Sequence, residues 1–159
     1  MPSMTTAISP ATPSDFDDIR ELMIEYSDTF DVRERCYQDL DAELAGLPGA
    51  YAPPEGALLI ARSDDGAAVG QVGLWRLDDG ICEMKRLYVR PAGQGTGLGR
   101  RLVEAVIAEG RRLGYRAMRL DTLPDMKTAQ GLYASLGFKP TARYNKNPVP
   151  DVIYLELAL

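Results

Sequence analysis

The sequence predicts a mixed α/β fold in which a central mixed β-sheet is flanked by helices. Two observations lead to this expectation. Strand-like runs outnumber helical ones, and the order along the chain reads β-α-α-β-β-β-α-β-α-β-β, with strands and helices alternating in its central part. The chain has 159 residues, of which 45% are hydrophobic, so we expect residues 1–159 to form one domain with a substantial core.

The first third of the chain suits a short strand and two helices. Thr5–Ser9 reads as the strand, and Thr12-Pro13-Ser14-Asp15 as a helix start, with a capping Thr, Pro at the first helical position and an acid three residues after the cap. A helix from Ser14 to about Asp28 follows from apolar residues at helical spacing, namely Phe16, Ile19, Leu22, Met23 and Tyr26. A weaker helix is expected over Cys36–Leu44 and a loop over Gly46–Gly56.

Three strand-like runs come next. They are expected over Ala57–Arg62, Ala68–Arg76 and Ile81–Arg90. Ser63-Asp64-Asp65-Gly66 is a hairpin signal between the first two runs, and Asp78-Asp79-Gly80 forms the turn into the third.

The last third alternates between helices and strands. A helix over Leu98–Leu113 is indicated by helical spacing of apolar residues and by Gly114 as a C-terminal stop. A strand over Arg116–Thr122 and a helix over Asp125–Leu136, ended by Gly137, are expected to follow. The final strands are predicted over Phe138–Tyr144 and Val152–Leu159.

The composition excludes several kinds of chemistry. The chain has no histidine, which excludes Ser-His-Asp and Cys-His nucleophile systems as well as His-ligated metal sites, so we expect no metal. A general base must then be a carboxylate, Tyr, Lys or Cys. Cys36 and Cys82 form neither a disulfide framework nor a zinc pattern and suit a reducing compartment. Since residues 1–13 lack a secretory signal and no long apolar segment occurs, we expect a cytoplasmic protein that does not enter a membrane.

Charge is distributed unevenly along the chain. Residues 1–80 hold 16 acids and 5 bases, whereas residues 81–159 hold 7 acids and 13 bases. The net charge of −5 argues against general nucleic-acid binding. The basic half is expected to meet an anion, and the acidic half either meets a cation or consists of ordinary solvated helix faces.

A glycine-rich turn joins a predicted strand to a predicted helix. The segment Gln94-Gly95-Thr96-Gly97-Leu98-Gly99 can direct several backbone N–H groups at one point, where the start of the helix adds partial positive charge. This predicts a phosphate site. The dinucleotide fingerprint GxGxxG fails in both registers, at Leu98 and at Arg100, and a Walker loop fails because no Gly-Lys pair follows.

Two motifs resemble those of a known family. Gln94-x-x-Gly97-x-Gly99, preceded by Leu87-Tyr88-Val89-Arg90-Pro91, is similar to the signature of the GNAT superfamily of N-acetyltransferases. Ala129-Gln130-Gly131-Leu132-Tyr133-Ala134-Ser135-Leu136-Gly137-Phe138 resembles the second signature of that family. The order of elements also matches, so the resemblance covers nearly the whole chain. It implies a GNAT-like fold, acetyl-CoA as the acyl donor, and direct transfer of the acetyl group to an amine.

The resemblance assigns the residues that bind acetyl-CoA. The pyrophosphate is expected against the backbone of Gln94, Gly95, Thr96, Gly97, Leu98, Gly99 and Arg100. Pantetheine is expected along Leu87, Tyr88 and Val89 as a pseudo-strand, which requires their strand to diverge from its neighbour. Many relatives carry an Asn seven residues before Tyr133, where this chain has Met126, and Thr122 or Thr128 is a candidate replacement.

The resemblance also suggests catalytic roles. The backbone N–H of Leu87 is expected to stabilise the oxyanion, and Tyr133 to protonate the leaving thiolate. Glu83, eleven residues before Gln94, is the candidate base. The alternatives are that ordered water or another acid takes that role, that Glu83 is an edge charge paired with a neighbouring base (Lys85 or Arg86), and that Tyr133 is a core aromatic residue.

The resemblance also implies that the acceptor lies between the first two helices, the Tyr51–Glu55 loop and the Tyr144–Pro150 loop. Arg86, if it faces this region, can pair with a carboxylate of the acceptor. A cationic amine can be attracted by the nearby acids Glu25, Asp28, Asp31 and Glu34.

Three functions follow from these features. The first is an N-acetyltransferase for a small-molecule amine. The second is a protein acetyltransferase acting on Lys or an N-terminus, and the third is a non-catalytic acyl-CoA-binding module. A homodimer is compatible with each of them.

Overall fold

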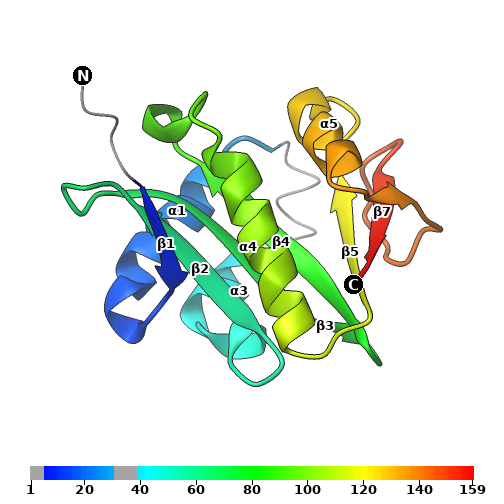
Figure 1. The fold of residues 1–159 in the computed structure, drawn as a ribbon, viewed down its shortest axis with the longest axis horizontal. Helices are drawn as coiled ribbons and strands as arrows, with labels where there is room; N and C mark the ends of the chain where they lie inside the picture. Colours follow the sequence, from blue (N-terminus) through cyan, green and yellow to red (C-terminus); the bar gives the residue numbers. More distant parts are fainter. Residues whose placement is uncertain (1–5, 31–38) are drawn as a thin grey trace.

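The computed structural model describes residues 6–30 and 39–159, and its centre is a seven-stranded mixed sheet (Figure 1). The strand order is β1-β2-β3-β4-β5-β7-β6. The strands are β1 (Ala7–Pro10), β2 (Ala57–Arg62), β3 (Ala68–Asp78), β4 (Ile81–Val89), β5 (Ala117–Thr122), β6 (Lys139–Pro140) and β7 (Ile153–Ala158). The helices are α1 (Phe16–Ser27), α3 (Leu40–Ala45), α4 (Leu98–Arg112) and α5 (Lys127–Ser135). The predicted mixed α/β fold class is confirmed.

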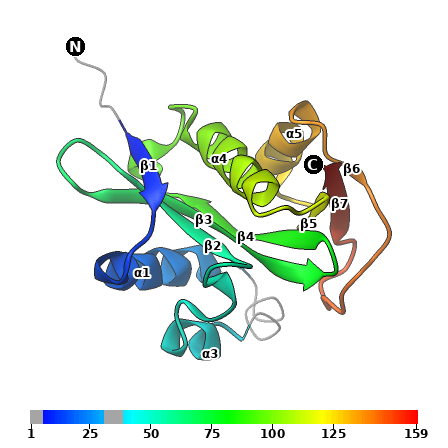
Figure 2. The same ribbon diagram turned by 60° about the horizontal axis from the view of Figure 1, so that its bottom comes forward.

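The helices cover both faces of the sheet. Helices α4 and α5 lie on one face, and α1 and α3 lie on the other (Figure 2). The larger core lies under α4, whose buried residues Leu98, Leu102, Val103, Val106 and Ile107 keep helical spacing. The smaller core lies under α1, where Ile19, Leu22 and Met23 are fully buried. No helix in the described ranges is long and apolar enough to cross a membrane.

Some element boundaries differ from the prediction. Pro13–Asp15 form a 3₁₀ turn, so α1 begins at Phe16. The helix expected over Cys36–Leu44 lies partly outside the described residues, and α3 begins at Leu40. The strand expected over Phe138–Tyr144 pairs with β7 only at Lys139–Pro140. One more backbone hydrogen bond runs from Thr141 to Tyr154, and the chain then turns into a loop tied by side-chain hydrogen bonds.

Strands β4 and β5 run parallel but pair over a short stretch. Ile81–Glu83 pairs with Ala117–Arg119, and the ladder ends there, although β5 pairs with β7 over its whole length. Beyond Glu83 the two strands diverge. This is the divergence that pantetheine binding along β4 requires.

A β-bulge shapes the diverging part of β4. Tyr88 pairs with Gln71 and Lys85 pairs with Gly73, so two residues of β4, Arg86 and Leu87, stand opposite one residue of β3. Arg86 has a left-handed backbone conformation with φ of 59°, which is uncommon for a residue with a side chain. The bulge therefore changes the direction of β4 where it separates from β5.

Candidate active site

The glycine-rich turn has the geometry that an anion site requires. Gly95 and Gly97 have φ values of 75° and 80°, in the left-handed region that favours glycine. Gly97 caps α4, and the N–H groups of the first helical residues, Leu98, Gly99 and Arg100, have no acceptor within the helix. A Cβ atom at Gly97 would project into open space rather than against protein. The turn thus presents free N–H donors and an unobstructed backbone to a ligand.

A wide cleft opens in front of this turn, with about 1510 Å³ of empty volume. We call it the glycine-turn cleft. All of the predicted cofactor-binding residues line it except Thr96, whose hydroxyl group donates to the carbonyl oxygen of Gly93. The rest of its lining comes from the start of α5 and the end of α1, with Tyr26, Thr29, Asp125, Met126, Lys127, Thr128, Ala129 and Leu132. Of these, the sequence pointed only to Met126 and Thr128.

The arginines after the turn are held by other parts of the protein. Arg100 donates to Glu104 at 2.9 Å and to Ser135 at 3.0 Å, and Arg101 donates to the carbonyl oxygen of Thr6 at 2.8 Å. Arg100 still lines the cleft, as does the exposed Lys127. The backbone donors and these two cations therefore face the same space.

Met126 occupies the position where many relatives carry Asn, and it lines the cleft. Of the two candidate replacements, Thr128 also lines the cleft, whereas Thr122 is buried and its hydroxyl group faces the Met126 sulfur at 3.8 Å. Thr128 is thus the threonine with access to a ligand.

A second pocket adjoins the cleft, and we call it the Tyr133 pocket. Tyr26 and Leu87 line both spaces, so the two are contiguous. The other residues of the pocket are Phe30, Met84, Lys85, Arg86, Asp121, Leu123 and Tyr133. The pocket lies where β4 and β5 diverge, and it brings together two of the three predicted catalytic groups, Leu87 and Tyr133.

Tyr133 lies at the base of this pocket on α5 and is 5% exposed. Its ring packs against Phe138, with the ring centroids 5.6 Å apart. No described residue forms a hydrogen bond with its hydroxyl group. Burial raises the pKa of Tyr133, and the neighbouring Tyr26 and Asp121 add to this effect. The phenol is therefore protonated at neutral pH and its proton is not committed to another protein group.

Glu83 lies on β4 beside the pocket rather than in its wall. It is 4% exposed, and its two carboxylate oxygens accept hydrogen bonds from Trp75 at 2.8 Å and from Tyr144 at 2.6 Å. Neither Lys85 nor Arg86 is its hydrogen-bond partner; the donors are two aromatic side chains. Glu83 is thus held rigidly on the face of the sheet that α1 and α3 cover.

Arg86 is already paired with an acid of α3. Its guanidinium donates two hydrogen bonds of 3.0 Å to Glu43, and its side chain is only 2% exposed. Tyr51 donates to the same carboxylate at 2.9 Å and stacks on Trp75. The expectation that Arg86 is available to a carboxylate of the acceptor is not met by this geometry.

The acids proposed to attract a cation differ in their environment. Glu25 binds Arg90 at 2.9 Å, so its charge is compensated within the protein. Asp28 lines a separate hollow with Asp39 and Asp41. The remaining two, Asp31 and Glu34, lie outside the described residues.

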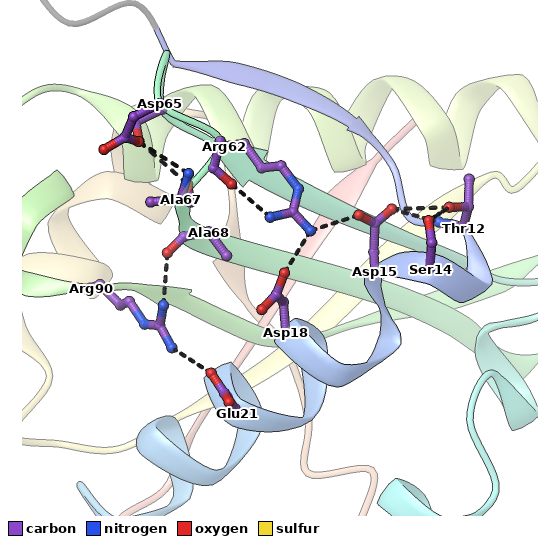
Figure 3. Close-up of polar contacts among 12 residues, drawn as sticks. Thr12, Ser14, Asp15, Asp18, Glu21, Arg62, Asp65, Ala67, Ala68 and Arg90 are labelled. Carbon is purple, nitrogen blue, oxygen red and sulfur yellow. Dashed lines mark hydrogen bonds and ion pairs between the residues drawn. The ribbon is translucent and has the colours of Figure 1, made fainter.

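Arginines at the ends of strands β2 and β4 attach α1 near the site (Figure 3). Arg90, directly before the glycine-rich turn, bonds the carboxylate of Glu25 and the carbonyl oxygen of Ala68 and lies 3.6 Å from Glu21. Arg62 of β2 bonds Asp15 and Asp18, each at 2.7 Å. These contacts fix α1, which supplies Tyr26, relative to the turn.

Asp121 is a pocket residue that the sequence did not point out. It follows Arg119 on β5, and its role depends on the loop after β6, which brings Asn145 and Asn147 against its Oδ2 atom at 2.8 and 3.3 Å. The only signal in the sequence is an acid near the end of a short strand, two residues after Arg119. Within the part of the chain that the structure describes, no group of three or more His, Cys, Asp or Glu side chains is placed to hold a metal ion.

Comparisons with known proteins identify the family. Residues 16–138 match the model of the acetyltransferase (GNAT) family. An uncharacterized N-acetyltransferase of Schizosaccharomyces pombe is 42% identical over 99% of this chain and 97% of its own. An aminoglycoside N(6')-acetyltransferase type 1 of Stenotrophomonas maltophilia is 30% identical over 70% of this chain and 78% of its own. The structure of yncA from Salmonella typhimurium with its cofactor acetyl-CoA has a TM-score of 0.76 and 27% identity, covering 97% of this chain and 94% of that one. The chain therefore belongs to the GNAT family of N-acetyltransferases and is an acyltransferase enzyme.

Proposed function

We propose that this enzyme transfers an acetyl group from acetyl-CoA to the primary amine of a small molecule. The observation that carries the proposal is that the glycine-turn cleft and the Tyr133 pocket meet at Leu87, where β4 leaves β5. A donor in the cleft and an acceptor in the pocket would meet at that backbone. An aminoglycoside acetyltransferase among the relatives, named for a small-molecule amine, supports this class of acceptor.

The cleft residues fit acetyl-CoA. Its pyrophosphate would accept hydrogen bonds from the free N–H groups at the start of α4, with Lys127 and Arg100 nearby. Its pantetheine arm would pair with the edge of β4 at Leu87–Val89 that β5 leaves open. Thr128 is positioned to donate to the arm in place of the missing Asn.

The residues of the pocket suit direct acyl transfer. The acceptor ammonium first loses a proton, and the free amine attacks the thioester carbonyl carbon, so that a C–N bond forms and the C–S bond breaks. The Leu87 N–H would stabilise the negative charge on the carbonyl oxygen. The sulfur leaves with the electron pair of the C–S bond and takes a proton from Tyr133, which regains one from the nitrogen. The products are the amide, the thiol of CoA and one proton.

Glu83 remains our candidate for the base. Its carboxylate lies on the same face of the sheet as the acceptor side of the pocket, and Tyr144 and Trp75 hold it there. Because Glu83 does not line the pocket, the proton would reach it through bridging water.

A panel of acceptors tests this function. Thiol release from acetyl-CoA is measured with small primary amines, with a lysine-containing peptide and with a peptide that has a free N-terminus, and mass spectrometry identifies the products. We expect acetylated small amines and a much lower kcat/KM for both peptides. Efficient peptide acetylation would instead indicate a protein acetyltransferase. Binding of acetyl-CoA without acetylation of any acceptor would indicate an acyl-CoA-binding module.

A further inference from the structure

Three carboxylates lie around the acceptor side of the site, and two of them are fully used by the protein. Glu43 is neutralised by Arg86. Glu83 accepts a hydrogen bond at each oxygen. The third, Asp121, forms no ion pair with any described residue, and its Oδ1 atom accepts no hydrogen bond from them. Asp121 is thus the carboxylate of this region whose charge and one oxygen are available.

The surroundings of Asp121 fix its position without neutralising it. Asn145 and Asn147 both donate to Oδ2 through neutral amides. Asn145 is itself held by the hydroxyl group of Tyr154 at 2.8 Å and by the N–H of Asn147 at 3.1 Å. A half-buried carboxylate held only by neutral donors gains more from a cation than an exposed one does, because water screens it less.

Asp121 also faces the reacting groups. It lines the Tyr133 pocket together with the backbone of Leu87, and its charge contributes, after burial and Tyr26, to the raised pKa of Tyr133. Across the pocket stand Tyr26 and Phe30, whose rings are in edge contact with centroids 4.6 Å apart. A ligand in this pocket therefore meets the Asp121 carboxylate and aromatic surface, as well as the side chains of Lys85 and Arg86.

We infer that Asp121 binds the ammonium group of the acceptor and that the pocket selects primary amines lacking a carboxylate over the corresponding amino acids. The inference rests on the proposed function. A carboxylate next to the amine would be repelled by Asp121. Two cations line the same pocket: Arg86 is bound to Glu43 and offers no compensating guanidinium, and the Lys85 ammonium lies over the Trp75 ring, 5.2 Å from its centroid. A substituent that is apolar or that carries a second amino group is not repelled by Asp121.

Matched pairs of acceptors test the selectivity in the wild-type enzyme. Phenethylamine, tyramine and putrescine are compared with phenylalanine, tyrosine and ornithine, which differ from them by one carboxylate. We expect kcat/KM for the best amine to exceed that of its amino acid by more than about tenfold, as expected for the loss of one charged hydrogen bond. An amino acid that is acetylated as well as its amine would overturn the inference.

Variants at the residue test the binding role. Asp121→Asn should raise KM for the best amine by about tenfold or more while the Kd for acetyl-CoA, measured by calorimetry, stays within about twofold. Asp121→Glu, which keeps the charge, should give an amine KM between that of the wild type and that of Asp121→Asn. Asp79→Asn makes the same chemical change at a fully exposed turn distant from the pocket and should leave both constants unchanged.

The outcomes separate the two proposals. An unchanged amine KM in Asp121→Asn, or a lower kcat with an unchanged KM, overturns the binding role of Asp121 while the proposed function stands. A wild-type enzyme that acetylates none of the amines contradicts the proposed function itself. If Asp121→Asn also loses acetyl-CoA affinity, which would indicate misfolding, Asp121→Ser is measured by the same criteria. The comparison of amines with amino acids needs no variant.

Discussion

At the scale of single residues, the Tyr133 pocket contains a phenol that is buried but has no described hydrogen-bond partner. The ring is buried, but the hydroxyl oxygen is not among the fully buried atoms of the described residues that lack a partner, so it is exposed to the pocket. The thiolate that would form as CoA leaves can accept its hydrogen bond. The phenol is thus suited to donate a proton late in the reaction.

The role of Tyr133 can be tested by removing its hydroxyl group. Tyr133→Phe keeps the ring against Phe138, so the Kd for acetyl-CoA should change little, whereas kcat should fall by ~10²-fold if the phenol is the general acid. Steady-state kinetics and calorimetry measure the two effects. Tyr115→Phe is a matched control, because Tyr115 donates to the carbonyl oxygen of Glu55 outside the pocket. Equal kcat values for the two variants would make Tyr133 a packing residue, provided that chemistry limits turnover.

Glu83 is tested by deleting its charge. Glu83→Gln should lower kcat/KM at least ~10-fold near neutral pH, with partial recovery at higher pH where more of the amine is unprotonated. The Gln amide can still accept from Trp75 and donate to the Tyr144 hydroxyl, but two charge-assisted hydrogen bonds become neutral ones, so we also expect a loss of about 1–3 kcal/mol in the free energy of unfolding.

A second variant separates the effect on rate from the effect on stability. Tyr144→Phe removes one hydrogen bond to Glu83 and keeps the carboxylate. If Glu83 is the base, Tyr144→Phe should be far more active than Glu83→Gln. A Glu83→Gln enzyme with the wild-type rate and pH profile would leave Glu83 with a structural role only.

The candidate site shows which residue-level features can be read from a sequence. The backbone groups of Gly97 and Leu87 belong to short local motifs, so their placement followed from the motifs. The environment of Glu83 could not be predicted, because its partners Trp75 and Tyr144 come from a different strand and from a loop 61 residues away. Asp121 was missed for the same reason, since its surroundings are created by the loop after β6.

At the scale of elements, the glycine-rich turn depends on backbone conformation. Gly97→Val would place a β-branched side chain at φ of 80° and in the path of the ligand. The Kd for acetyl-CoA should rise well beyond ~10-fold, and stability should fall by about 1–2 kcal/mol from the left-handed conformation alone. Calorimetry and urea denaturation measure these quantities.

Gly66 provides the matched control for this substitution. It has a φ of 85° in the turn between β2 and β3, and a Cβ there also meets nothing within 4 Å. Gly66→Val should therefore show a similar loss of stability with no loss of acetyl-CoA affinity. If Gly97→Val binds acetyl-CoA as the wild type does, the assignment of the turn as the anion site is wrong.

The attachment of α3 to β4 depends on one buried ion pair. Glu43→Ala would leave the Arg86 guanidinium, only 2% exposed, without its partner, and we expect the free energy of unfolding to fall by about 3–5 kcal/mol. In Glu43→Ala/Arg86→Leu part of this loss should return, because no unpaired charge is then buried. Glu104→Ala, which breaks an exposed pair with Arg100, should cost no more than about 0.5 kcal/mol. Urea denaturation measures all three, and equal losses in the two single variants would contradict the prediction.

Element positions were predicted well where periodicity was regular. The strand over Ala57–Arg62 has the predicted bounds, and α4 and β7 differ from the predicted ranges by one residue at one or both ends. The prediction was wrong for most of Phe138–Tyr144. There the apolar residues suggest a strand, but Pro140 and the polar side chains that follow favour local hydrogen bonds over a ladder.

At the scale of the whole molecule, the acidic half of the sequence serves the fold itself. Acids of α1, of the turn before it and of α3 pair with arginines of β2 and β4 and with Arg90, which directly follows β4. The pairs are Asp15 and Asp18 with Arg62, Glu25 with Arg90, and Glu43 with Arg86. The uneven distribution of charge along the chain therefore arises in part from acids that attach helices to arginines of the sheet. The sequence alone left this open, because it does not show which distant charges meet.

Three tyrosines, two of them buried and Tyr144 half-buried, give the whole molecule a sensitivity to alkaline pH. Burial raises the pKa of Tyr51, Tyr133 and Tyr144 above their ordinary value of ~10. Above pH ~10 the unfolded chain therefore binds fewer protons than the folded one, and the free energy of unfolding falls as pH rises. The expected slope is up to ~1.4 kcal/mol per pH unit for each tyrosine, with no contribution below pH ~9.

Thermal unfolding at a series of pH values measures this slope. Tyr144→Phe removes one of the three groups and should make the decline above pH ~10 shallower. A Tm that stays constant up to pH ~11, or the same slope in Tyr144→Phe, would contradict the assignment of these tyrosines as buried neutral groups.

The short ladder between β4 and β5 leaves few backbone hydrogen bonds across the sheet beside the place where we propose that pantetheine binds. Only Ile81–Glu83 and Ala117–Arg119 join the half of the sheet that contains β1–β4 to the half that contains β5–β7. Local opening in proteins starts where backbone hydrogen bonds are few, so amide hydrogens along this seam should exchange with solvent sooner than those at the centre of β3. A pantetheine arm paired with β4 would supply the missing hydrogen bonds and slow that exchange. The acyl donor would then act as a removable strand, and the mechanical continuity of the sheet would vary with each catalytic cycle.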